Sequence, residues 1–330
     1  MSEELLLKVE NLRTHFHTKT GIVKAVDGID FELRKGETLG VVGESGSGKS
    51  MTAWSILGMV PKPAGRIESG RILYHGEDLV QKSDDEMREI RGTGICMVMQ
   101  DPLTSLNPVI NIKKQLTETL ELEYEEDKPS LVQRAIGLLS SVNIPAPEMR
   151  VTSFPHEMSG GMRQRVVGAI SISRSPDILI ADEPTTSLDV TIQLQYLKLL
   201  KDIQEETGVG IIFITHDFGI VAKMCDRVAV MYAGHIIEQA DVVELFDNPK
   251  HPYTKALLKS VPDLDDDVDM LPTIEGQPPD LANTPSGCAF RDRCPNPSDD
   301  CRKGNIEMGM IEVSPGHFVD QCCVNCGDIQ

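Results

Sequence analysis

The stretch that decides the fold is Gly43-Glu44-Ser45-Gly46-Ser47-Gly48-Lys49-Ser50, which fits the pattern G-x-x-x-x-G-K-[ST] in full. A short apolar run, Thr38 to Val42, precedes this loop, and a helical pattern beginning at Ala53 follows it. A strand, a glycine-rich turn and a helix in this order form the context in which such a loop binds phosphate. We expect its amides and Lys49 to contact phosphate oxygens, and the Ser50 hydroxyl to hold Mg²⁺.

Polar residues that could bind a metal or take part in catalysis follow two further apolar runs. Ile178 to Ala181 is followed by Asp182 and Glu183, and Gly210 to Thr215 is followed by His216. Many buried strands end in an acid, and a lone histidine at a turn is more often structural. Together with a phosphate-binding loop, however, Asp182 suits Mg²⁺ and Glu183 is placed to orient or deprotonate an attacking water. We expect His216 to contact the γ-phosphate.

The order of the predicted elements indicates an α/β fold. Val190, Leu194 and Leu197 have helical spacing, and Gly208 is placed to end that helix. A strand, a helix and a strand in sequence favour a parallel sheet. Around residues 100–165 the pattern becomes mostly helical, with one apolar face that runs from Leu131 to Val142.

Composition sets the remaining limits on domains and function. With 330 residues, 40% of them hydrophobic, the chain has enough apolar material for a sizeable core. Its net charge of −19 opposes nucleic-acid binding. We expect a nucleotide-binding domain over 1–260, an acidic, proline-rich linker over 261–287 and a small cysteine-rich domain over 288–330. No apolar run is long enough to span a membrane, and the N-terminus does not resemble a secretory signal, which indicates a cytoplasmic protein.

The segment Met158-Ser159-Gly160-Gly161-Met162-Arg163-Gln164-Arg165 identifies a family resemblance. It resembles the signature motif LSGGQ of ABC transporter ATPases, with methionine at both ends. The chain is similar in particular to the ATPase subunits of dipeptide/oligopeptide-type importers, and three further segments carry this resemblance: Gln100 to Pro108, Asp182 to Thr191, and Asn248 to Thr254.

The resemblance implies a P-loop ABC ATPase domain with a mixed core sheet, an N-terminal antiparallel β part and a helical insertion. It also implies ATP and Mg²⁺ as cofactors, with Mg²⁺ held by Ser50, Gln100 and Asp182. Glu183, Gln100 and His216 would be catalytic, and Met51 would contact ATP beside the loop. Ser159, Gly160 and Gly161 would act on the partner subunit's ATP, and Asp189 would connect the two sites. Phe16 is the candidate for stacking on adenine, with a place in the core or on the surface as the alternative.

The resemblance further implies how the protein assembles. A second ABC ATPase would complete the dimer, as a heterodimer or alternatively as a homodimer. Two membrane permease subunits would contact the helical insertion, and an extracellular substrate-binding protein would take part indirectly. The chain would then lie peripherally at the cytoplasmic face of the cell membrane. Its cargo would be di- or oligopeptides, with nickel or oligosaccharides as alternatives. A competing hypothesis is a soluble ABC ATPase with a redox-sensing tail.

Cysteines gather near the C-terminus, where six of the eight lie between Cys288 and Cys326. In a reducing compartment such clustering suggests metal ligands before disulfides. Cys288, Cys294 and Cys301 resemble the importer tail that is associated with a [4Fe–4S] cluster, with Cys322 as the fourth ligand and Cys323 or Cys326 as alternatives. Four thiolates also suit Zn²⁺, and disulfides or free thiols remain a third possibility.

Overall fold

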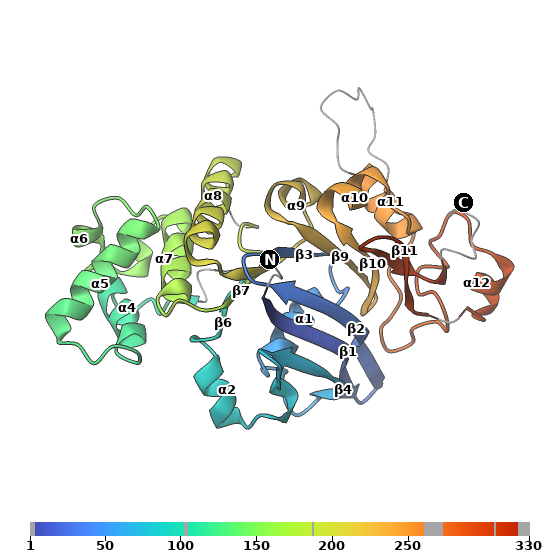
Figure 1. Ribbon diagram of the computed structural model, residues 1–330, viewed down its shortest axis with the longest axis horizontal. Coiled ribbons are helices and arrows are strands. Elements are labelled where there is room, and N and C mark those ends of the chain that lie inside the picture. Colours follow the sequence, from blue (N-terminus) through green and yellow to red (C-terminus); the bar gives the residue numbers. More distant parts are fainter. Residues whose placement is uncertain (1–3, 102–104, 187, 261–272, 307, 323–330) are drawn as a thin grey trace. The chain divides into compact units, whose positions relative to one another are not determined.

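The structure, a computed structural model, describes residues 4–101, 105–186, 188–260, 273–306 and 308–322 (Figure 1). Cys323, Cys326 and most of the first half of the predicted linker lie outside these residues. The chain divides into two compact units. The first unit comprises Met1–Leu6, Arg34–Gly36 and Ser83–Phe213, and the second comprises Leu7–Leu33, Glu37–Lys82 and Ile214–Gln330.

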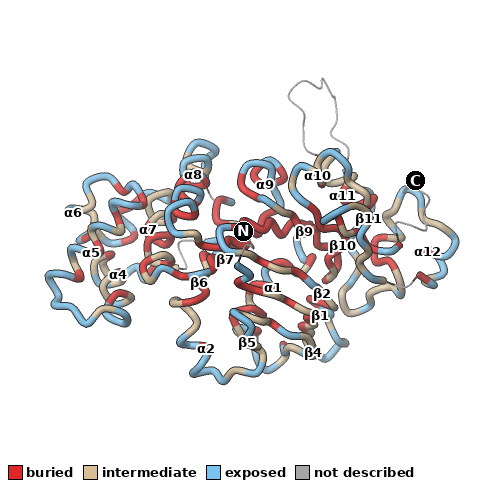
Figure 2. The backbone as a smooth tube through the Cα atoms, viewed as in Figure 1, coloured by how far each residue is buried: buried red, intermediate tan, exposed pale blue. Residues whose placement is uncertain are grey.

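The first unit combines a pair of parallel strands with several helices. β6 (Ile95–Val98) pairs with β7 (Ile178–Asp182), with Ile95 opposite Ile178 and Val98 opposite Ala181. Every residue of β7 is buried, as expected for a strand covered on both faces (Figure 2). The helices of this unit are α2 (Asp84–Ile90), α4 (Ile112–Leu120), α5 (Lys128–Ser141), α6 (Pro147–Arg150), η2 (Pro155–Glu157), α7 (Gly160–Ile172) and α8 (Val190–Thr207).

Helix α8 shows how local sequence sets an element's ends. The Asp189 carboxylate accepts hydrogen bonds from two amides of the first turn, and Gly208 ends the helix in a left-handed conformation with a φ of 73°. The helix is confirmed, but two of the three apolar residues that predicted it are exposed: Val190 by 70% and Leu194 by 46%. The buried face instead carries Tyr196, Leu197, Leu199, Leu200, Ile203 and Gln204.

The second unit contains an antiparallel sheet in the order β2-β1-β4-β5 and strands in the order β11-β12-β10-β9-β3. β3 is parallel to β9 whereas β10 is antiparallel to it, so the sheet is mixed, as the resemblance implies. The strands are β1 (Leu5–Thr18), β2 (Gly21–Arg34), β3 (Thr38–Val42), β4 (Gly65–Tyr74), β5 (Glu77–Asp78), β9 (Arg227–Tyr232), β10 (His235–Asp241), β11 (Met310–Ser314) and β12 (His317–Asp320).

Short helices complete the second unit: α1 (Lys49–Ile56), η1 (Leu79–Gln81), α9 (Phe218–Met224), α10 (Val242–Asp247), α11 (Pro252–Lys259) and α12 (Asp299–Lys303). The boundary between the units runs through β8 (Gly210–Thr215), which is buried along its whole length. No helix within the described residues is long and apolar enough to cross a bilayer.

The C-terminal residues add strands to the sheet of the second unit. β12 pairs with β10, with Val319 opposite Glu238, and β11 pairs with β12. The separate, irregular cysteine-rich domain expected over 288–330 is therefore not confirmed, because its described residues include two ordered strands that continue a sheet begun earlier in the chain. The predicted domain boundaries stay a prediction.

A buried carboxylate fixes this C-terminal pairing. Glu238 and His317 are fully buried, and His317 Nε2 lies 2.8 Å from Glu238 Oε1. The Glu238 carboxylate also accepts hydrogen bonds from the amides of Lys250, at 2.6 Å, and His251, at 2.9 Å. His317 Nδ1 lies 3.2 Å from Glu244 Oε1. β10, the residues just before α11, and β12 thus meet at one carboxylate.

We expect His317→Gln to destabilise the protein more at low than at high pH. Burial opposes the charged imidazole, but the hydrogen bonds to Glu238 and Glu244 outweigh it and raise the pKa of His317. Stability from a raised histidine pKa is fully present below the unfolded value of about 6.5 and is lost as pH rises through the folded value. The loss of unfolding free energy should be about 3 kcal/mol near pH 5.5 and smaller near pH 9.

Urea denaturation of both proteins across this pH range measures the difference. The exposed His156→Gln is the matched control. A pH-independent loss for His317→Gln would contradict a charged pair.

Candidate functional site

The glycine-rich loop of residues 43–50, hereafter the P-loop, is shaped by close backbone contacts. Gly43 and Gly48 have positive φ angles of 154° and 107°. A Cβ at Gly43 would lie 2.2 Å from the Met231 carbonyl oxygen, and one at Gly48 would lie 2.3 Å from that of Ala25. Only glycine fits at either position, because the neighbouring atoms are backbone. Helix α1 begins directly after Gly48.

Two side chains of the P-loop are buried with polar groups that suit an anion. Lys49 is 6% exposed, and its Nζ donates to the carbonyl oxygens of Gly43, at 2.8 Å, and Glu44, at 2.9 Å. The buried Ser47 hydroxyl has no hydrogen-bond partner among the described residues. Ser50 is exposed and Met51 half-buried on the first turn of α1. A restrained ammonium and an unpaired hydroxyl at a helix N-terminus fit a phosphate group.

The carboxylates of Asp182 and Glu183, at the end of β7 in the first unit, form a second polar site. Asp182 is 7% exposed at the end of β7. Glu183 has a φ of 46°, which is uncommon for a residue with a side chain. Its Oε2 accepts hydrogen bonds from Gln100 Nε2, at 2.9 Å, and Thr186 Oγ1, at 3.0 Å. The structure therefore brings together two of the predicted catalytic residues, Gln100 and Glu183.

The signature segment forms the beginning of helix α7. Ser159 caps the helix, and its Oγ accepts a hydrogen bond from the Met162 amide at 3.3 Å. A Cβ at Gly161 would lie 2.5 Å from Ile192 Cγ2 of helix α8, whereas Gly160 has open space around it. Met158 is 3% exposed, so methionine here serves as a core residue, as leucine would.

The remaining predicted residues have less specific surroundings. His216 is exposed at the end of β8, and the adjacent Asp217 caps helix α9. Phe16 is half-buried on β1 opposite Gly65, where a Cβ would lie 2.7 Å from the Phe16 ring. These positions leave the roles of His216 and Phe16 as predictions.

Four of the predicted ligand cysteines line one small pocket in the second unit, hereafter the cysteine pocket. Cys288, Cys301 and Cys322 are buried and Cys294 is half-buried. The described cysteines form no disulfide. The other residues lining the pocket are His251, Pro252, Phe290 and Arg291. Because the thiols come from three separate segments, a shared ligand is a physical reason for their convergence.

His251 is a pocket residue that sequence reasoning did not select. Ligand atoms of His251, Cys288 and Cys322 lie within 4.8 Å of one another. The Tyr253 amide donates to His251 Nδ1 at 3.0 Å, which leaves Nε2 as the protonated nitrogen of the neutral ring. Nε2 lies 3.8 Å from Cys322 Sγ. Burial lowers the pKa of His251 to about 4, so the ring is neutral at pH 7. The Asn248–Thr254 segment carried the family resemblance, but no chemistry was assigned to it.

Comparisons with known proteins agree with this geometry. Residues 26–186 match the family model described as ABC transporter, and residues 237–301 match that of the oligopeptide/dipeptide transporter C-terminal region. The chain is 50% identical to the oligopeptide transport ATP-binding protein OppD of Bacillus subtilis, over 95% of this chain and 87% of that protein. It is 48% identical to the dipeptide transport ATP-binding protein DppD of the same organism, over 98% and 94%. A solved bacterial ABC transporter cassette, described as dimeric, is similar at a TM-score of 0.64 and 25% identity, over 72% of this chain and 99% of that chain.

We expect Gly43→Ala to disrupt the P-loop far more than Gly46→Ala, its matched control. Both glycines have positive φ, so each alanine carries a conformational cost of roughly 1–2 kcal/mol. Only at Gly43 does the new Cβ also meet a backbone oxygen, at 2.2 Å, whereas Gly46 has nothing within 4 Å. Urea denaturation measures the difference in unfolding free energy. Equal losses for both variants would contradict the contact with Met231.

Proposed function

Because this chain belongs to the ATP-binding proteins of oligopeptide and dipeptide ABC transporters, we propose that it hydrolyses ATP to power the import of short peptides. The membership confirms the resemblance that the motifs predict and the class of enzyme, an ABC-type ATPase. The names of the two Bacillus subtilis relatives support peptides as the cargo. The observation that carries the proposal is the hydrogen bond between the Gln100 amide and the Glu183 carboxylate.

The residues of the two polar groups have distinct roles in this proposal. The P-loop amides and Lys49 bind the phosphates, and Ser50 and Asp182 hold Mg²⁺, which neutralises charge on the phosphate oxygens. Glu183 orients the attacking water and accepts its proton, while His216 contacts the γ-phosphate. Gln100 shares a hydrogen bond with Glu183, so it is placed to report on this carboxylate to the helices that follow it.

We further propose that the active form is a dimer with a second ABC ATPase, a related chain rather than a second copy. Ser159, Gly160 and Gly161 then contact the partner's nucleotide, and Asp189 connects the two sites. Val190 and Leu194 are exposed near the start of α8, the helix that Asp189 caps, which supports a protein interface there. Exposed apolar residues of the helical insertion support a contact with two membrane permease subunits at the cytoplasmic face of the membrane: Val109, Leu122 and Met149.

For the cysteine pocket we propose a [4Fe–4S] cluster held by Cys288, Cys294, Cys301 and Cys322. All four line one pocket, and thiolates are the ligands that such clusters require. His251 Nε2–H, 3.8 Å from Cys322 Sγ, would then donate a hydrogen bond to a ligand sulfur and not bind metal itself. Zn²⁺ held by His251, Cys288 and Cys322 is the alternative, because these three residues approach one another most closely.

We expect Glu183→Gln to keep ATP affinity and to lower kcat by about 10²–10⁴-fold, because the amide cannot accept the proton of the attacking water. ATP turnover and equilibrium binding of labelled ATP measure the two effects in the complete transporter. Lys49→Ala should instead weaken binding. Glu206→Gln, an exposed acid on helix α8, is the matched control and should leave both unchanged.

Turnover near wild type in Glu183→Gln would contradict the catalytic role. In cells, the same variant should abolish uptake of a labelled dipeptide. Normal dipeptide uptake with loss of nickel or oligosaccharide uptake would contradict the peptide cargo.

Metal analysis after anaerobic purification tests the cysteine pocket. We expect about four irons and four sulfides per chain with broad absorption near ~400 nm. Cys294→Ser should remove the cluster, whereas His251→Gln should retain it with an altered spectrum, since the histidine acts through a hydrogen bond. One zinc per chain that is lost in His251→Gln and kept in Cys294→Ser would establish the alternative site.

A further inference from the structure

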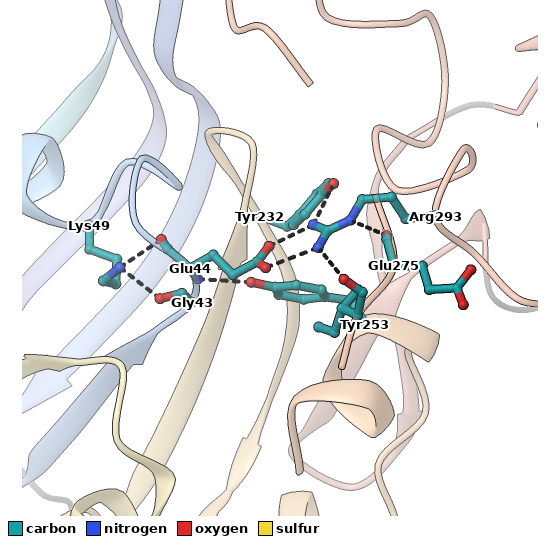
Figure 3. Close-up of polar contacts among 8 residues, drawn as sticks. Gly43, Glu44, Lys49, Tyr232, Tyr253, Glu275 and Arg293 are labelled. Carbon is teal, nitrogen blue, oxygen red and sulfur yellow. Dashed lines mark hydrogen bonds and ion pairs between the residues drawn. The ribbon is translucent and has the colours of Figure 1, made fainter. Parts of the chain in front are cut away.

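A single arginine links the cysteine-rich segment to the P-loop. Arg293 directly precedes Cys294, and its side chain is 5% exposed. Its guanidinium makes a two-pronged ion pair with Glu44, the second residue of the P-loop: Nη1 lies 2.6 Å from Oε2 and Nη2 lies 3.0 Å from Oε1 (Figure 3). Parallel contacts of this kind are the strongest geometry for an arginine and a carboxylate.

The other donors of Arg293 hold its side chain in place. Nε donates to the Glu275 carbonyl oxygen at 3.0 Å, and Nη1 also lies 3.3 Å from the Tyr232 hydroxyl. The Glu44 carboxylate raises the pKa of Arg293 further above its ordinary value. The arginine is therefore charged, and its side chain is held in one orientation next to Cys294.

Glu44 is held at three points, which makes it a fixed end of the P-loop. Arg293 binds its carboxylate, the Tyr253 hydroxyl accepts a hydrogen bond from its amide at 2.9 Å, and its carbonyl oxygen accepts one from Lys49 Nζ. Figure 3 shows the Glu44 side chain directed toward Arg293 and its carbonyl group toward Lys49. The same residue thus contacts the C-terminal segment on one side and the phosphate-binding lysine on the other.

Tyr253 provides a second connection to the cysteine pocket. It follows His251 by two residues, and His251 contacts Cys322. The Phe290 ring, which lines the pocket, packs with its centroid 5.3 Å from that of Tyr253 and 5.8 Å from that of His251. Pocket residues and the groups that hold Glu44 are therefore in direct contact, and packed side chains of this kind carry coupling between sites.

Arg293 also changes the net charge of the P-loop, because it neutralises Glu44. A carboxylate within a loop that binds polyphosphate repels its ligand, and the repulsion is strong where solvent is partly excluded. Arg293 neutralises Glu44 without adding a free cation. If the ion pair is purely structural, breaking it should lower the stability of the protein. If Arg293 neutralises Glu44, breaking the pair should lower the affinity for the anion, and removing the carboxylate as well should restore that affinity.

We propose that Arg293 is a positioning residue of the nucleotide site, and that through it the arrangement of the cysteine pocket sets the affinity of the P-loop for ATP. This inference rests on the proposed function, because it requires the P-loop to bind ATP. It assigns to the C-terminal segment a direct part in nucleotide binding. By linkage, bound ATP stabilises the pocket to the same extent as the intact pocket favours ATP.

Equilibrium binding of labelled ATP to the full chain tests the arginine. Arg293→Met should weaken ATP binding about ten-fold, and Arg293→Lys should recover part of the loss because it restores the charge without the paired contacts. The double variant Glu44→Gln, Arg293→Met should return to within about two-fold of wild type, since no carboxylate then needs neutralising. Arg302→Met is the matched control, because Arg302 is an exposed arginine of the same segment whose Nε donates to the Pro297 carbonyl oxygen.

A second arm tests the connection to the cysteine pocket. Cys294→Ser should weaken ATP binding in the wild-type background and have a much smaller effect in Arg293→Met, because the arginine next to Cys294 carries most of the coupling. An equal loss of ATP affinity from Cys294→Ser in both backgrounds would overturn the link. Unchanged ATP affinity in Arg293→Met would also overturn it, as would a double variant with Glu44→Gln whose ATP affinity stays low. If wild type and Lys49→Ala bind ATP equally, the proposed function fails instead, so the two failures are distinguishable.

Discussion

The nucleotide site depends on two backbone carbonyl groups that occupy the space a side chain would need. The oxygens of Met231 and Ala25 lie against Gly43 and Gly48, so the P-loop is pressed against β9 and β2. The Gly234 amide donates to the Ser47 carbonyl oxygen at 2.9 Å, which adds a further contact on the same side. Because this backbone is fixed from outside, Lys49 can be buried with its ammonium held by loop carbonyls. The shape of the loop is thus supported by contacts within the protein.

Features that the sequence predicted well are those that a short stretch determines. The P-loop, the buried runs at Thr38 and Ile178, and the helix that ends at Gly208 all depend on residues within a few positions of one another. The exposure of Val190 and Leu194 was not predictable in this way, because periodicity identifies an apolar face but not what covers it. Residues next to a protein interface have the same pattern as residues of a core.

The contacts that sequence reasoning missed join residues far apart in the chain. Arg293 and Glu44 are separated by 249 positions, and His251 and Cys322 by 71. Cysteine spacing suggested a ligand set, yet no spacing rule includes a histidine that lies in another segment and contacts a thiol through its protonated nitrogen. Glu183 is a different case: its chemistry was predicted, but its left-handed backbone was not. That strain is the kind found where function, and not local preference, selects the residue.

Glu238 joins the C-terminal strands to the earlier part of the second unit. Its carboxylate is fully buried on β10, yet its partner His317 lies 79 residues further along the chain. A chain that lacked β12 would lose both the histidine that pairs with Glu238 and the strand that pairs with β10 at this position. The C-terminal strands are therefore part of the sheet and not an appendage to it. Glu238 and His317 thus join β10 and the C-terminal strands into one structural unit.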